Sequence, residues 1–178
     1  ENNLRLIEDG RWGSHKMRLY PSQNEPFTIM YDSWKLHSRQ LVDMSPDDAR
    51  KAAAEIDAKV LSNRKPPYSL AGGLFDAMED AGGDMFKADN EELRYWKKRF
   101  AELEGIDIHD APAVAVASLA QAVNEGAVKK DETIMLNITG GGEELAKSEQ
   151  EVFYAKPHVV LDPALPAEDI ISSVKGLF

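Results

Sequence analysis

The apolar run from Thr133 to Ile138 passes directly into a threonine and three consecutive glycines, Thr139 to Gly142. Because charged residues precede the run and glycines follow it, the pattern predicts a buried strand over 133–138. In open α/β sheets, ligands bind beyond the carboxyl ends of the strands, where glycine lets a ligand approach the main chain closely. The hydroxyl of Thr139 adds a hydrogen-bonding group there. From this pattern alone, a ligand loop and an unoccupied glycine turn are equally good interpretations, since the segment matches neither a Walker motif nor GxGxxG.

Helical patterns alternate with a few apolar strand candidates along the rest of the chain. Ser45 with Pro46 predicts a helix start, and the apolar spacing extends that helix to about Ser62. Residues 21–24 and 63–68 have loop compositions. This alternation predicts an α/β fold with a mainly parallel sheet and flanking helices. The other predicted helices cover 27–36, 74–82, 90–103, 110–126 and 166–174, and the other predicted strands cover 16–20 and 158–161.

The composition narrows the classes of function. The 178 residues carry a formal net charge of -10, which argues against nucleic acid and anionic membranes as partners. There is no cysteine and no local pair among the four histidines, so we predict no disulfide and no metal site. No apolar run is long enough to span a bilayer, and the chain is expected to be cytoplasmic. It opens without methionine in the middle of a helical pattern, so we expect it to be a piece of a longer protein.

Four further features have both a structural and a functional interpretation. The amides of Gly72 and Gly73 precede a helix and are either an anion site or a tight helix entry. Glu104 is either an exposed residue in a last helical turn or a buried carboxylate facing a site. His109 lies just before a helix start, where a loop or capping residue is more common than a catalyst. The charged stretch 143–151 is typical of a solvated loop or surface helix.

Four motifs together resemble one enzyme family. In this order, the chain contains SQNEPF, VLSNRKPPYSLAGGLFDAM, ELEGIDIHDAPAVAVASLAQAV and LNITGGG. They resemble the C-terminal part of the cysteate synthases, threonine-synthase-like members of the fold type II pyridoxal-phosphate enzymes. The resemblance extends from about Gly10 to Gly142. It implies that residues 1–178 are the C-terminal portion of such an enzyme, in the large-domain part of its fold.

The resemblance implies a cofactor and a reaction. The family binds pyridoxal phosphate between two α/β domains, using a Schiff-base lysine and a phosphate loop that would both precede Glu1. A hydroxyl at the end of a late strand meets the pyridine nitrogen, and that position matches Thr139, with Gly140, Gly141 and Gly142 beside the ring. The family replaces the phosphate of O-phosphoserine by sulfite, giving cysteate for coenzyme M synthesis. By position, the resemblance also implies cleft roles for Asn24, Gly72 and Gly73.

The resemblance leaves two alternatives open. One is threonine synthase, which acts on O-phosphohomoserine, although LNITGGG departs from the glycine motif of those enzymes. The other is a non-catalytic α/β binding module that kept the fold, since no lysine of this chain stands in a recognisable Schiff-base motif. For the enzyme, a homodimer is the family expectation, and this chain is expected to be inactive alone.

Overall fold

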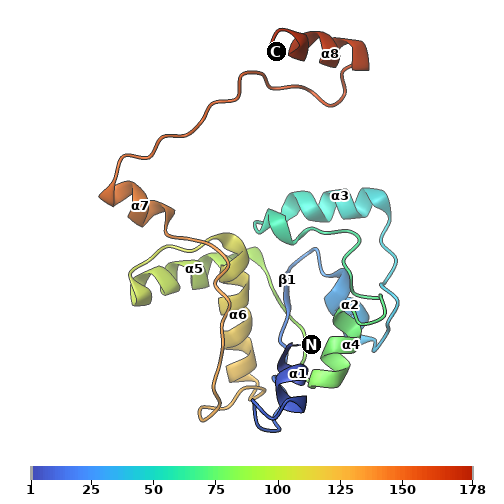
Figure 1. Ribbon diagram of the computed structural model, residues 1–178, viewed down its shortest axis with the longest axis vertical. Coiled ribbons are helices and arrows are strands. Elements are labelled where there is room, and N and C mark those ends of the chain that lie inside the picture. The colour runs from blue at the N-terminus through green and yellow to red at the C-terminus, as the bar shows by residue number, and fades with distance from the viewer. Residues whose placement is uncertain (1, 178) are drawn as a thin grey trace. The chain divides into compact units, whose positions relative to one another are not determined.

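The computed structural model describes residues 2–177 and divides the chain into two compact units, Glu1–Leu145 and Ala146–Phe178. The first contains short strands and helices whose order is shown in Figure 1. Its elements are α1 (Asn2–Glu8), β1 (Ser22–Asn24), α2 (Ile29–Lys35), α3 (Pro46–Glu55), the 3-10 turn η1 (Lys59–Leu61), α4 (Leu74–Ala81), β2 (Phe86–Ala88), α5 (Asn90–Glu104), α6 (Asp110–Asn124) and the start of α7 (Glu143–Glu149).

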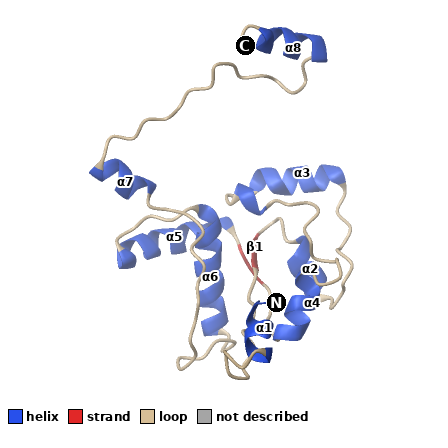
Figure 2. Ribbon diagram, in the orientation of Figure 1, coloured by secondary structure: helices blue, strands red, loops and turns tan. Residues whose placement is uncertain are grey.

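The sheet of the first unit has two short parallel strands, drawn in red in Figure 2. Ser22 pairs with Phe86 and Asn24 pairs with Ala88. Helix α6 packs against both strands and against α5, so the sheet is covered by helix on that side. The predicted α/β class with parallel strand pairing is therefore confirmed at the level of this small sheet.

Strand β1 corrects the sequence prediction, which made residues 21–24 a loop. Gln23 and Asn24 are polar, yet both side chains are almost completely buried. The Oε1 atom of Gln23 accepts hydrogen bonds from the amides of Met30 and Tyr31, both at 2.9 Å, at the start of α2. Backbone amides thus satisfy the side-chain oxygen of Gln23, while its Nε2 atom is buried without a partner among the described residues. The local sequence does not reveal these distant partners.

The strand predicted over 133–138 was wrong for this structure. These residues have no regular secondary structure, and Met135 is 83% exposed. The strands predicted over 16–20 and 158–161 are also absent. A strand needs a neighbour that continues its ladder of backbone hydrogen bonds, and within residues 2–177 none of these three segments belongs to the sheet. The segment 16–20 has one such bond, from the amide of Asp84 to the carbonyl oxygen of Leu19 at 3.2 Å.

The helix predictions are confirmed, apart from the end of α3. The amide of Asp48 donates to Ser45 Oγ at 3.1 Å, so Ser45 caps α3 as expected. However, α3 ends at Glu55 rather than near Ser62, and Ile56 leaves the helix with extended backbone to lie fully buried beside Phe27. Burial of this side chain therefore prevails over the helical pattern that continues in the sequence.

Replacing Ser45 by alanine is expected to lower the free energy of unfolding by about 1 kcal/mol, because the first turn of α3 loses its side-chain acceptor. Chemical denaturation followed by circular dichroism measures this change. Ser45→Asp is the control, since a carboxylate also caps a helix. Equal losses in the two variants would show that the cap contributes nothing.

The largest packed region near the candidate site lies between α5 and α6. Leu93, Ile108 and Val114 are fully or almost fully buried there, and Leu61 of η1 packs against the same cluster. Ile108 belongs to the short connection from α5 to α6. This connection is therefore anchored in the core at its centre, while its flanking residues reach the surface.

The second unit begins within α7, continues without regular structure over 150–166, and ends in α8 (Ala167–Lys175). Helix α8 confirms the helix predicted over 166–174. Within the described range 2–177, every helix is too short or too polar to cross a membrane.

Candidate functional site

The glycine segment lies antiparallel to the connection between α5 and α6. Ile108 and Gly141 form an isolated antiparallel bridge. The amide of His109 donates to the carbonyl oxygen of Gly140 at 3.0 Å, and the amide of Gly142 donates to the carbonyl oxygen of Asp107 at 2.7 Å. These two hydrogen bonds define the bridge and fix residues 140–142 against residues 107–109. We call this pairing the glycine bridge.

The glycine bridge explains why two of the three side chains are absent. A Cβ atom added to Gly141 would lie 2.6 Å from the Cα atom of Ile108, and its φ of 154° is a conformation that favours glycine. A Cβ atom on Gly140 would lie 2.6 Å from His109 Nδ1. The close approach that requires glycine is therefore made by the chain's own backbone and His109, before any ligand is considered.

Asp107 holds the segment that follows the glycines. Its Oδ1 atom accepts hydrogen bonds from the amides of Glu144 at 3.2 Å and Leu145 at 3.3 Å, in the first turn of α7. Partial burial raises the pKa of the Asp107 carboxyl. The hydrogen bonds from the backbone amides together lower this pKa by more than burial raises it, so it lies below its ordinary value. Asp107 therefore favours its charged form in this position.

These contacts are expected to weaken in acid. Because the folded pKa of Asp107 is depressed, its hydrogen bonds are fully present above the unfolded pKa of about 4 and are lost as pH falls through the lower folded value. The amide signals of Glu144 and Leu145, followed by NMR from neutral pH downward, should shift in that window. In Asp107→Asn the acid-dependent shift should disappear, and its persistence would contradict this assignment.

His109 and Glu104 have the structural positions that their sequence context favours. His109 is the N-cap residue of α6, is exposed, and places Nε2 3.1 Å from an oxygen of Glu143. Glu104 is the exposed last residue of α5. Glu104 is thus an exposed helix end, as one of its two interpretations has it. His109 occupies the N-cap position, although its side chain makes no capping hydrogen bond.

Within residues 139–142, Thr139 has the side chain that can hydrogen-bond a ligand. It is exposed, and within residues 2–177 no hydrogen bond involves its hydroxyl. The next residue, Gly140, is fixed by the glycine bridge. Thr139 thus presents an uncommitted donor and acceptor at a fixed position of the backbone.

Asn24 is fully buried in a hydrogen-bond network. Its Nδ2 atom donates to the carbonyl of Ala88 at 3.0 Å and to Asn90 Oδ1 at 3.1 Å. Its Oδ1 atom accepts from the amide of Ala58 at 2.9 Å. Asn90 Oδ1 in turn accepts from the amide of Asp57. The network joins β1, β2 and the segment after α3, while the cleft role of Asn24 stays a prediction.

The amides of Gly72 and Gly73 both have partners within the chain. The amide of Gly72 donates to Asp76 Oδ2 and the amide of Gly73 donates to the carbonyl of Leu70, both at 2.8 Å. A Cβ atom on Gly73 would lie 2.8 Å from that same carbonyl oxygen. The pair forms a tight entry into α4, and its place near a cleft stays a prediction.

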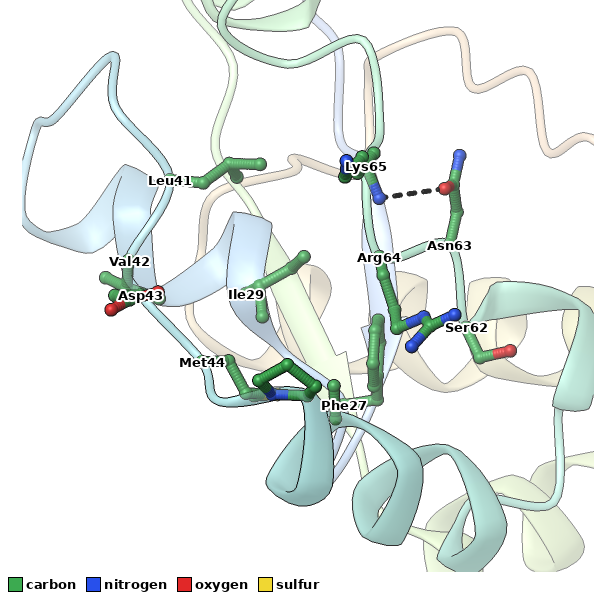
Figure 3. A pocket seen from close by; sticks show the side chains of 12 residues that line it. Phe27, Ile29, Leu41, Val42, Asp43, Met44, Ser62, Asn63, Arg64 and Lys65 are labelled. Atoms are coloured by element: carbon green, nitrogen blue, oxygen red, sulfur yellow. Dashed lines mark hydrogen bonds between the residues drawn. The ribbon is translucent and has the colours of Figure 1, made fainter.

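The first unit contains a pocket of about 800 Å³, shown in Figure 3, that was not predicted from the sequence. Apolar side chains from the start of α2 and from α3 form one part of its lining, and the polar segment Ser62–Lys65 forms another. The only signal in the sequence was the pair of cations in a loop. Within the described residues, no group of three metal-ligating side chains is present.

The fold and site define an α/β chain with a fixed glycine segment and an open threonine hydroxyl. No protein family model matches this chain. Among curated proteins, it is similar to enzymes named cysteate synthase along nearly its whole length. It is 46% identical to the Methanosarcina mazei protein over 162 residues, which are 90% of this chain and 39% of the relative. The Methanosarcina acetivorans protein is 45% identical over 96% of this chain and 41% of the relative. The Methanocella paludicola protein is 40% identical over 98% of this chain and 41% of the relative.

The resemblance inferred from the four motifs is thereby confirmed. This chain spans about two fifths of the length of the curated relatives it matches.

Proposed function

We propose that this chain is the C-terminal part of a pyridoxal-phosphate-dependent enzyme that converts O-phosphoserine and sulfite to cysteate and phosphate. The observation that carries this proposal is 46% identity to a cysteate synthase over 90% of the chain. The curated relatives reported above share that name, which favours cysteate synthase over threonine synthase. The same similarity favours an enzyme over a non-catalytic module.

The residues present fit a pyridine ring beside Thr139. The hydroxyl of Thr139 has no partner among the described residues and would hold the ring nitrogen. A neutral hydroxyl does not keep a proton on that nitrogen as a carboxylate would. The glycine bridge keeps the backbone beside Thr139 in place without a side chain that could obstruct the ring. When bound, the cofactor supplies the electron-withdrawing system needed to remove phosphate and add sulfite.

The remaining parts of the site would belong to the part of the relatives' length that this chain does not match. The Schiff-base lysine and the cofactor's phosphate loop would lie there, so the chain alone would be inactive. The exposed apolar residues Ile134, Met135 and Ile138 support this assignment, since an apolar extended segment is suited to pairing within a larger sheet of the fold type II kind. A homodimer is part of the same proposal.

A chimera tests the proposed reaction. This chain would replace the matching segment of the Methanosarcina mazei relative, and circular dichroism would verify folding. The chimera should release phosphate from O-phosphoserine and form cysteate only when sulfite is added, while this chain alone should do neither. Formation of threonine from O-phosphohomoserine by a folded chimera, with no cysteate from O-phosphoserine, would contradict the proposal.

A further inference from the structure

The pocket in Figure 3 combines an apolar floor with a cationic edge. Phe27, Ile29 and Ala49 belong to the floor and are buried. Arg64 extends over the pocket beside Phe27, and Lys65 is next to it on the same loop. A volume of about 800 Å³ falls within the range of small-molecule sites.

The two cations at this edge differ from most others in the chain. Arg39 pairs with Asp76, Lys35 with Asp84 at 2.7 Å, and Arg18 with Glu132. In the described part of the chain, no ion pair and no side-chain hydrogen bond involves the guanidinium of Arg64 or the ammonium of Lys65. Two adjacent uncompensated cations in a protein of net charge -10 create a local positive potential suited to an anion.

The loop that carries these cations is held by its own contacts. Ser62 Oγ donates to the carbonyl of Lys59 at 2.7 Å, and the amide of Lys65 donates to Asn63 Oδ1 at 3.0 Å. Two prolines follow at 66 and 67 and restrict the backbone further. Less conformational freedom is therefore lost when a ligand binds.

The same segment connects the pocket to the core beside the glycine bridge. Leu61 packs against the cluster that contains Ile108, and Ile108 forms the bridge with Gly141. The four residues after Leu61 line the pocket. The segment 61–65 therefore contacts both the core cluster that includes Ile108 and the pocket.

We propose that Arg64 and Lys65 form a subsite for a phosphate or sulfite oxyanion, while the apolar floor accommodates the carbon part of a small ligand. A guanidinium can contact two oxygens of one phosphoryl or sulfonate group, which gives Arg64 the larger role. Asp43 lies across the pocket from Arg64 and offers a carboxylate to a ligand ammonium. The identity of the anion rests on the proposed function, which supplies two sources: the phosphoryl group of O-phosphoserine and sulfite.

Titration of this chain, labelled with nitrogen-15, tests the subsite directly. Inorganic phosphate should shift the amide signals of residues 62–65. Arg64→Gln should weaken phosphate binding about tenfold, the loss of a charge-assisted hydrogen bond, and Lys65→Gln should weaken it less. Lys130→Gln is the matched control, because Lys130 is an exposed lysine outside the pocket. The Lys130→Gln variant should bind phosphate with unchanged affinity.

Two outcomes would overturn the subsite. Either phosphate leaves residues 62–65 unperturbed, or Lys130→Gln weakens binding as much as Arg64→Gln does. Parallel titrations with sulfite and with O-phosphoserine distinguish the two sources of the anion. If O-phosphoserine binds more tightly than inorganic phosphate, the subsite holds the phosphoryl group of the substrate. If O-phosphoserine binds more weakly than inorganic phosphate and sulfite binds, the subsite holds the sulfite nucleophile.

The chimera separates this inference from the proposed function. Arg64→Gln should raise the KM for the anion that the titrations assign about tenfold, with a smaller change in kcat. An active chimera with unchanged KM values would remove Arg64 from the site and leave the reaction in place. An inactive chimera, together with Arg64-dependent phosphate binding by this chain, would remove the reaction and leave the subsite in place.

Discussion

Replacing Asn24 by alanine is expected to lower the free energy of unfolding by about 3 kcal/mol. Without the Asn24 side chain, the amide of Ala58 loses its hydrogen-bond acceptor. The carbonyl of Ala88 and the side-chain oxygen of Asn90 each lose a hydrogen-bond donor. Each buried polar group left without a partner costs about 1–3 kcal/mol, and these groups lie where three parts of the fold meet. Such a loss is a large fraction of the stability of a small domain.

Chemical denaturation of this chain measures the effect of Asn24→Ala. The matched control is Asn63→Ala, because Asn63 is exposed and supports a single turn hydrogen bond to the amide of Lys65. Its loss should stay below about 1 kcal/mol. If the two variants were equally stable, the buried network would not be what joins β1, β2 and the segment after α3.

Replacing Gly141 by alanine is expected to open the glycine bridge. The new Cβ would collide with the backbone of Ile108, and the φ of 154° would be strained for alanine. Overpacking and backbone strain each cost about 1–3 kcal/mol, so the exchange of the amide hydrogens of His109 and Gly142 should accelerate about a hundredfold. The surface segment should open locally rather than unfold the core, so hydrogen exchange is the appropriate measurement.

Gly105→Ala is the control for Gly141→Ala. Gly105 also has a positive φ, of 72°, but a Cβ there would meet no atom within 4 Å. It should cost only about 1–2 kcal/mol of backbone strain and leave the exchange of His109 and Gly142 unchanged. Equal exchange at these two amides in both variants would show that the close contact with Ile108 does not hold the bridge.

The sequence predicts helices well here because their signals are local. Ser45 and Asp89 cap the helices that follow them, and Gly105 ends α5 with a left-handed residue. Strand β1 could not be predicted in this way, because Gln23 and Asn24 are polar and their burial depends on partners far along the chain. The reverse error at 133–138 has the same cause, since an apolar run becomes a strand only beside another strand.

The candidate site shows a similar division. The motif at 139–142 was found from the sequence, and its position after a helix and an apolar run made Thr139 a candidate. The contact of Gly141 with Ile108, more than thirty residues earlier in the chain, could not be predicted from the glycine run itself. Nor could the pocket, which brings residues near 27, 46 and 64 together although the loop composition revealed only two adjacent cations.

In the proposed function the Thr139 hydroxyl contacts the pyridine ring, and the absorbance spectrum of the cofactor-loaded chimera tests this contact. Thr139→Ala should shift the absorbance band of the bound cofactor and lower turnover about tenfold, as expected for the loss of one hydrogen bond. Thr139→Ser keeps the hydroxyl and should retain the band and most of the turnover. A Thr139→Ala chimera that binds the cofactor with an unchanged band and unchanged turnover would contradict the claim.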